Sequence, residues 1–328
     1  MINYIPPIGQ EKVISYFENA KSNNKMSAAY ILEGESGIGK KEIAKYLSLL
    51  VMCNEDKPCL KCEKCTYTLA GTNPDIIVIS NEDKASVGVE KVRDIIQEAY
   101  VLPKVSNKKL FIIENAHLMT HGAQNCILKV LEEPPEYVMF LLLCEKIDLL
   151  LPTIRSRSVV VSVKKLSKEN LSKITGCKDE FLLEYSGGRV GKLTSLLNDE
   201  NFVILRNSFF DKMKLLLGKN ESDLYKIYDF LDENKESKDL IFEMLTSFFR
   251  DVLFYKNLCE EFVINKDKTE YILLFSEKLS LKNCQKICEI IFEIQTQMGK
   301  YGGYSVNIHT MLIKIWEEIY GWRSGSPL

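Results

Sequence analysis

The chain has 328 residues, a length typical of two or three domains, and 46% of them are hydrophobic, as in ordinary globular proteins. Its formal net charge of -2 gives no broad attraction to DNA or to an acidic membrane surface. No apolar stretch is long enough to span a bilayer, and the first residues lack the basic and apolar segments of a signal peptide. We therefore expect a cytoplasmic protein with no membrane partner.

The first half of the chain alternates between short apolar runs and amphipathic segments. The pattern predicts a helix at 13–20 and then a buried strand at 28–33 that leads into a glycine-rich loop. Further strands are expected at 75–80, 109–114, 138–144 and 159–163, and further helices at 41–52, 89–100 and 124–133. Because apolar strands alternate with helices, the sequence predicts an α/β layer with a parallel sheet.

The pattern changes after residue 163. Residues 164–200 are expected to form short helices interrupted by Gly187-Gly188, and residues 201–328 are helical nearly throughout, with a frayed tail from 321. The sequence thus predicts three domains, at 1–163, 164–200 and 201–328.

The glycine-rich loop has the frame of a phosphate-binding P-loop. The frame G-x-x-x-x-G-K is supplied by Gly34, Gly39 and Lys40, with Gly37 inside it, between a predicted strand and a predicted helix. The next position normally carries a Ser or Thr whose hydroxyl binds Mg²⁺, but here it is Lys41. An ammonium has no lone pair to give to a metal.

A second catalytic position of such proteins is also altered. The predicted strand at 109–114 ends in Glu114-Asn115, where active P-loop enzymes carry one acid for Mg²⁺ and a second that polarises the attacking water. Glu114 can still contact a metal at a longer reach, whereas the amide of Asn115 cannot take a proton. We expect no intrinsic ATPase, while binding of ATP or ADP stays open.

Four cysteines lie close together in the sequence. Cys53, Cys59, Cys62 and Cys65 supply the ligand set of a closed, structural Zn²⁺ site, a knuckle over residues 53–65. The alternatives are four free thiols in a loop or a redox pair, and both are less favoured because exposed thiols at this density are a liability. The other six cysteines are expected to be small core residues: Cys126, Cys144, Cys177, Cys259, Cys284 and Cys288.

Two further polar groups have simpler interpretations. His117 and His121 lie four residues apart, but a metalloprotease would need a Glu directly after the first His, so we interpret them as the polar start of a helix. Arg155 and Arg157 lie in a basic stretch between two predicted strands. An arginine there is either part of a solvated loop or a finger that reaches a phosphate bound by a neighbouring subunit.

Several runs resemble one known family. They are Leu110-Phe-Ile-Ile-Glu-Asn-Ala-His117, Leu128-Lys-Val-Leu-Glu-Glu-Pro-Pro135 and Leu151-Pro-Thr-Ile-Arg-Ser-Arg157, together with Ile8-Gly9-Gln10, Asn73-Pro74-Asp75 and the cysteine knuckle. The chain resembles the delta-prime subunits of the bacterial DNA polymerase III clamp loader, with the specific motifs at about residues 8–160.

The resemblance implies an AAA+ module, a helical lid and a helical collar that assembles into a five-subunit ring with tau/gamma and delta subunits. Such rings load the sliding clamp onto primed DNA, and delta-prime serves as a stator. Arg157 matches the family's arginine finger, although Ser158 follows it where the family has Cys. Around Gly191 the phosphate-sensing arginine of active relatives is missing, and Arg189 is a candidate substitute. Ser27-Ala28-Ala29 departs from the family's Ser-His-Ala.

Two other classes of function are considered. One is an active AAA+ motor subunit of the tau/gamma type, against which Lys41 and Asn115 argue. The other is a DNA-binding accessory protein, which the near-neutral net charge does not favour. The preferred prediction is a non-catalytic subunit of a DNA-directed DNA polymerase holoenzyme.

Overall fold

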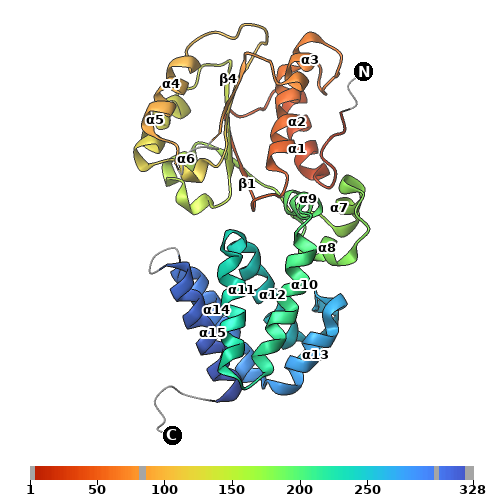
Figure 1. Cartoon of the computed structure of the whole chain (residues 1–328). Coiled ribbons are helices and arrows are strands. Elements are labelled where there is room, and N and C mark those ends of the chain that lie inside the picture. Colours follow the sequence, from red (N-terminus) through yellow and green to blue (C-terminus); the bar gives the residue numbers. More distant parts are fainter. Residues whose placement is uncertain (1–3, 81–85, 299–302, 322–328) are drawn as a thin grey trace. The chain divides into compact units, whose positions relative to one another are not determined.

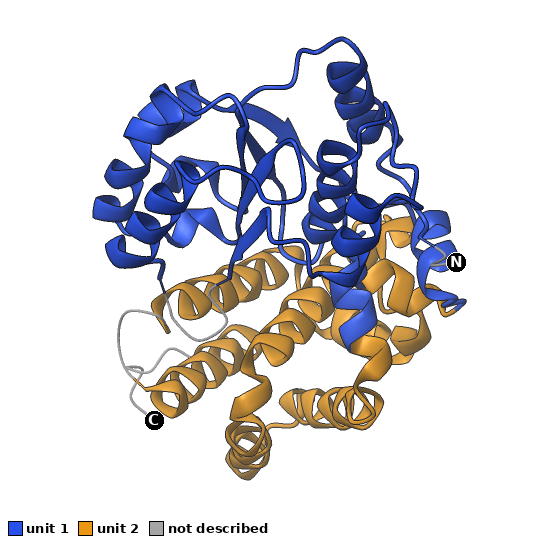
Figure 2. Cartoon of the chain, turned by 90° about the horizontal axis from the view of Figure 1, so that it is seen from above, with its two compact units in different colours: residues 1–178, 186–195 blue, residues 179–185, 196–328 orange. Residues whose placement is uncertain are grey.

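The computed structural model describes residues 4–80, 86–298 and 303–321. The chain divides into two compact units: residues 1–178 with 186–195, and residues 179–185 with 196–328 (Figure 2). The expected tail lies almost wholly outside the described residues. Within the described ranges, no helix is both long and apolar enough to cross a membrane.

The first unit is built on a five-stranded sheet in the order β2-β3-β4-β1-β5, with every pairing parallel. The strands are β1 (Ala29–Glu33), β2 (Ile76–Ile79), β3 (Lys109–Ile113), β4 (Val138–Cys144) and β5 (Val159–Ser162). The predicted parallel α/β layer is therefore confirmed, and the carboxyl ends of β1, β3 and β4 meet at one edge of the sheet.

Helices cover both faces of this sheet, because alternate strand residues point to opposite faces. Tyr30 and Leu32 belong to the core under α1 (Glu11–Ser22) and α2 (Lys40–Met52). Ala29 and Ile31 belong to the core under α4 (Val89–Ala99) and α5 (His121–Glu132). Figure 1 shows these two pairs of helices on opposite sides of the strands.

The shorter elements of the unit lie in the connections. The α-helices are α3 (Glu63–Ala70), α6 (Pro152–Ser156), α7 (Lys168–Thr175) and the first part of α9 (Val190–Asn198). The 3₁₀ helices are η1 (Ala116–Leu118) and η2 (Ile147–Leu149).

Three expectations need correction. Strands β2 and β5 are partly exposed rather than buried on both faces, because they are the two edges of the sheet. The basic stretch expected as a loop contains the short helix α6, which Pro152 begins with a preset φ angle. Of the six cysteines expected in the core, Cys126, Cys259 and Cys288 are only partly buried.

The second unit is helical in its described residues, as expected. Its α-helices are α8 (Glu180–Tyr185), the end of α9, α10 (Phe202–Lys214), α11 (Glu221–Glu233), α12 (Lys238–Lys256), α13 (Thr269–Lys278), α14 (Leu281–Gln297) and α15 (Tyr304–Tyr320). Its 3₁₀ helices are η3 (Leu215–Leu217), η4 (Lys235–Ser237), η5 (Glu260–Phe262) and η6 (Lys266–Lys268). The long helix α12 packs against α13 and α14, and α15 packs against α11 and α14.

Helix α8 packs with this second unit through contact with a buried arginine. Arg206 on α10 is 6% exposed and its guanidinium lies 3.6 Å from the ring centre of Phe181 on α8. The same guanidinium donates to both carboxylate oxygens of Asp267 and to the side-chain oxygen of Asn265. The segment 164–200 is therefore divided between the two units, with α7 in the first and α8 in the second.

Candidate functional site

The P-loop joins β1 to α2 at the carboxyl edge of the sheet. Gly37 and Gly39 have φ angles of 71° and 103°, in the left-handed region that other residues rarely adopt. Lys40 begins α2 and is 8% exposed, and its ammonium donates to the carbonyl oxygens of Gly34 and Glu35. Burial lowers the pKa of Lys40. The loop thus has the shape and the lysine of a phosphate site.

Lys41 stands at the sequence position of the Ser or Thr that would bind magnesium, and its side chain forms an ion pair. Its Nζ atom lies 2.7 Å from Oε2 of Glu114, which follows directly after β3. The Glu114 side chain is 12% exposed, whereas that of Lys41 is 65% exposed. The structure therefore pairs the altered residue Lys41 with Glu114, the acid that the sequence left as a possible metal contact.

The residue after Glu114 also lacks catalytic chemistry. Asn115 has a φ angle of 50°, a left-handed conformation that asparagine tolerates, and begins η1. Its amide cannot act as a base. Mg²⁺ prefers oxygen ligands in octahedral geometry. Here the Glu114 carboxylate is already paired with the Lys41 ammonium. The residues present do not fit a bound magnesium ion.

An apolar cavity of about 250 Å³ lies beside the P-loop within the first unit. Its lining includes Ile38 and Gly39 of the loop together with Leu166, Ile174 and Val190, and three polar or charged residues also contribute: Gln10, Glu42 and Lys173. The N-terminal residues 5–8 complete its wall. A flat, largely apolar group the size of a nucleobase suits such a lining. Sequence reasoning missed this cavity, because its walls come from separate segments and Ile8 served only as a family marker.

The start of α9 packs directly on the P-loop. The backbone N–H of Gly191 donates to the carbonyl oxygen of Gly37 at 2.8 Å, and a Cβ atom on Gly191 would lie 2.9 Å from Cα of Gly37. Only glycine permits this approach. Arg189, the candidate phosphate sensor, donates from Nε to the carbonyl oxygen of Ser186 at 3.2 Å. Its sensing role stays a prediction.

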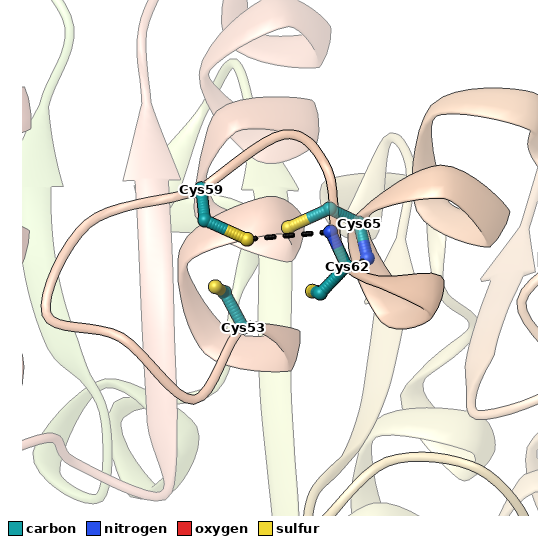
Figure 3. A group of neighbouring side chains, drawn as sticks. All are labelled: Cys53, Cys59, Cys62 and Cys65. Atoms are coloured by element: carbon teal, nitrogen blue, oxygen red, sulfur yellow. Dashed lines mark hydrogen bonds between the residues drawn. The ribbon is translucent and has the colours of Figure 1, made fainter.

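The four clustered cysteines converge on one point. Their sulfur atoms all lie within 4.8 Å of one another, and Figure 3 shows the four side chains facing a common centre. Tetrahedral Zn–S bonds of about 2.3 Å place sulfurs roughly 3.8 Å apart, within the 4.8 Å limit of this cluster, so the four thiols can serve as a zinc ligand set. Among the residues that the structure describes, no other group of His, Cys, Asp or Glu side chains has metal-ligand spacing.

The protein backbone favours the thiolate form at part of this cluster. Sγ of Cys59 accepts from the backbone N–H of Cys62 at 3.4 Å, and N–H donors at Lys61 and Cys62 lower the pKa of Cys59 to about 6. Cys62 caps α3 by accepting from the N–H of Cys65. Burial raises the pKa of Cys65, so this thiol needs a bound cation to ionise.

Lys21 holds the segment that leads into the cysteine cluster. From the last turn of α1, its ammonium donates to the carbonyl oxygens of Leu50 and Cys53 at 2.7 Å each, and also to that of Glu55. Leu50 lies in the last turn of α2, where helix carbonyls lack partners of their own, and Cys53 and Glu55 lie just beyond its end. Sequence reasoning missed Lys21, because it lies far from the cysteines along the chain.

Arg157 is presented at the surface of the first unit. It caps the C-terminus of α6, donates to the carbonyl oxygen of Thr153 at 3.0 Å, and pairs with Glu132 at 2.7 Å. Its side chain is 34% exposed. Arg155, two residues earlier, forms a separate pair with Asp148 at 3.4 Å. The two arginines thus have different partners.

The two histidines do not form a metal site in the described structure. Nδ1 of His117 lies 3.4 Å from the backbone N–H of Glu145, and His121 interacts with Asn125 at 3.0 Å. Burial lowers the pKa of His117. His121 is the first residue of α5, in keeping with the interpretation of a polar helix start.

Two family models match the chain. One, described as DNA polymerase III, delta subunit, matches residues 9–167, and the other, described as DNA polymerase III, delta subunit, C terminal, matches residues 200–316. Together they span most of the chain and both of its units.

Curated relatives agree with these models. DNA polymerase III subunit tau of Bacillus subtilis is 28% identical, over 76% of this chain and 49% of the relative. DNA polymerase III subunit delta' of Yersinia pestis is 29% identical, over 73% of this chain and 74% of the relative. DNA polymerase III subunit gamma of Buchnera aphidicola (strain Sg) is 31% identical, over 50% of this chain and 46% of the relative. The chain therefore spans about half the length of the tau and gamma relatives.

Solved structures are more distant. The crystal structure of a DNA polymerase III gamma subunit-related protein from Thermotoga maritima is 20% identical, with a TM-score of 0.49 over 92% of this chain and 99% of that chain. The RuvB Holliday junction branch migration motor of the same organism is 16% identical, with a TM-score of 0.39 over 75% of each chain. From its family-model matches and its curated relatives, the chain belongs to the family of DNA polymerase III clamp-loader subunits.

Proposed function

We propose that this chain is the delta-prime-type, non-hydrolysing subunit of a DNA polymerase III clamp loader, which assists loading of the sliding clamp onto primed DNA. The observation that carries the proposal is the Lys41–Glu114 ion pair at 2.7 Å, formed by the residue that stands where the P-loop frame calls for a magnesium-binding hydroxyl. Asn115, directly after Glu114, supplies no base for water. A subunit with both defects depends on its neighbours for ATP hydrolysis, and so the tau/gamma-type motor role is disfavoured.

Arg157 is the residue through which this subunit acts on a neighbour's ATP. Its side chain is one-third exposed and held by Glu132, whose side chain is 48% exposed. An ion pair at such a surface contributes only about 0–1 kcal/mol, so the guanidinium exchanges Glu132 for a phosphate at little energetic cost. A planar, bidentate guanidinium suits the charge that develops on a transferred phosphate.

The remaining parts have supporting roles in this proposal. Zn²⁺ bound by Cys53, Cys59, Cys62 and Cys65 has no open coordination position and holds the knuckle in shape. The all-α residues 201–328 serve as the collar that contacts tau/gamma and delta subunits, and residues 164–200 as the lid of an AAA+ domain at 1–163. This three-part division differs from the two compact units, which assign 164–178 and 186–195 to the first unit and 179–185 and 196–200 to the second.

The test uses a reconstituted ring containing this full chain, ATP-hydrolysing tau-type subunits and delta. The pure chain should show no ATP turnover above background, with or without primed DNA. In the ring, Arg157→Ala should leave assembly intact and remove hydrolysis at the adjacent site, because an arginine finger contributes about 10³-fold or more. Total turnover should then fall to that of the remaining sites.

Arg155→Ala is the matched control, since Arg155 lies on the same short helix but pairs with Asp148. It should leave turnover unchanged, and Arg157→Lys should behave like Arg157→Ala because a lysine lacks the fork. Undiminished turnover with Arg157→Ala would refute the finger, and robust turnover by the pure chain would refute the non-hydrolysing role.

A further inference from the structure

The P-loop site keeps its phosphate-binding parts while it has lost its metal-binding parts. The glycine turns, the buried Lys40 and the adjoining apolar cavity are all present. In place of the metal-ligating hydroxyl the chain has Lys41, whose ammonium lies 2.7 Å from Glu114. This inference rests on the proposed non-hydrolysing role and concerns which form of nucleotide such a site accepts.

Charge explains why a lysine can take the place of a metal. A di- or triphosphate carries several negative charges and is stable in a site only with nearby positive charge and N–H donors. Lys41 provides a covalently tethered cation, and its side chain is exposed enough to turn from Glu114 toward a ligand. A divalent ion carried in by the nucleotide would meet this ammonium and be repelled by it.

Several carboxylates oppose phosphate at this site. Glu114 pairs with Lys41, while burial lowers the pKa of Lys40 and the carboxylates of Glu145, just after β4, and of Glu35 act in the opposite direction. A phosphate group therefore competes with these acids for the two ammonium groups. The competition gives Glu114 a definite role, because it holds Lys41 in the absence of ligand and does not bind metal.

We propose that the P-loop binds a nucleoside di- or triphosphate without a divalent cation, with the Lys41 ammonium as its counter-charge and the apolar cavity beside Ile38 as the site of the base. The phosphate chemistry alone would also suit inorganic pyrophosphate. The cavity favours the nucleotide, because it offers an apolar wall to a base that pyrophosphate lacks.

Isothermal titration of the full-length chain with ADP, in EDTA and in excess Mg²⁺, tests the proposal. We expect wild-type affinity in EDTA to equal or exceed that in Mg²⁺. Lys41→Thr restores a metal-ligating hydroxyl and should reverse the order, with Mg²⁺ improving affinity about tenfold. Lys41→Met removes the charge without adding a ligand and should bind weakly in both conditions. Lys45→Met removes a lysine one turn further along α2 and should behave as wild type.

The variant Glu114→Gln provides an independent test of the proposal. It releases Lys41 and removes a repelling charge, so metal-free ADP should bind several-fold more tightly. If Glu114 were a metal ligand, the same change would weaken binding in Mg²⁺ instead. Pyrophosphate should bind more weakly than ADP, and equal affinity would overturn the assignment of the base to the cavity.

Two results would overturn the proposal as a whole: tighter wild-type binding in Mg²⁺ than in EDTA, or no ADP binding in either condition. Neither result bears on the delta-prime role, because that role is judged separately by the effect of Arg157→Ala on turnover in the assembled ring. A failure of the metal-free site and a failure of the proposed function are therefore distinguishable.

Discussion

The ammonium of Lys21 on α1 lies 2.7 Å from the carbonyl oxygen of Cys53, the first cysteine of the predicted zinc site. The same ammonium reaches Leu50 and Glu55, so one side chain ties the end of α2 to the start of the knuckle. It also brings positive charge near a site that would carry two net negative charges with zinc and four thiolates. Lys21 is therefore expected to position the ligands and to offset their charge.

Replacing Lys21 with Met should weaken zinc binding by about 10–100-fold, the range found when a group that orients metal ligands is removed. Zinc release to a chromophoric chelator measures the effect, with circular dichroism to confirm that α1 and α2 remain folded. Lys12→Met, at an exposed position of the same helix, is the control. Equal release rates for the two variants would rule out a positioning role for Lys21.

Removal of zinc should destabilise the first unit. Cys53 and Cys65 are buried against Leu49, so an empty site leaves thiols without their bonding partner in an apolar cluster. Elemental analysis of the wild-type protein should give one equivalent of zinc, and Cys53→Ser should abolish it and lower the melting temperature. Because zinc binds thiolates, zinc affinity should also fall as pH decreases. Cys126→Ser is the control, and a zinc-free wild-type protein of unchanged stability would contradict the assignment.

Asp75 should stabilise the fold in a pH-dependent way. It is 0% exposed, and its carboxylate accepts backbone N–H groups of Lys104, Val105 and Ser106 at 2.6 to 2.8 Å. Burial acts to raise the pKa of Asp75, but these donors outweigh it and lower the pKa below the ordinary value. Its contribution to stability is therefore complete above about pH 4, the unfolded pKa, and is lost as pH falls through the folded pKa.

Asp75→Asn should accordingly reduce the free energy of unfolding by about 1–3 kcal/mol at neutral pH. The reason is that the NH₂ group of the new amide would face backbone N–H groups, which need an acceptor. The difference from wild type should shrink below about pH 4. Urea unfolding across a pH series measures both effects, with the exposed Asp94→Asn as the matched change. A difference that is constant with pH would argue against the charged carboxylate as the stabilising form.

Gly191→Ala should disturb the P-loop through backbone contact. The new Cβ atom would meet Cα of Gly37 at 2.9 Å, a distance that requires the loop or the start of α9 to move. We expect a loss of about 1–3 kcal/mol in unfolding free energy, as for other overpacked positions. Gly88→Ala places its Cβ in open space and should have a smaller effect. Equal stabilities in thermal unfolding would show that the loop adapts freely.

The sequence by itself determined the elements and their chemistry. Apolar runs alternating with amphipathic segments indicated the parallel sheet, because strand and helix periodicities are local properties of a chain. The P-loop frame and the cysteine spacing were recognisable for the same reason, since each site lies largely in one short segment. The edge positions of β2 and β5 and the helix within 152–156 were not predictable, because strand order and partner contacts are not local.

Only the tertiary structure decided how distant residues meet. The sequence marked Lys41 and Asn115 as two separate defects and left Glu114 able to contact a metal, whereas the fold pairs Lys41 with Glu114 by placing the start of α2 beside the end of β3. Lys21 reaches the knuckle because α1 packs on α2, and the apolar cavity exists because 5–8, the P-loop and α9 converge. These relationships depend on packing between segments that are far apart in the chain, and local sequence patterns carry no information about such packing.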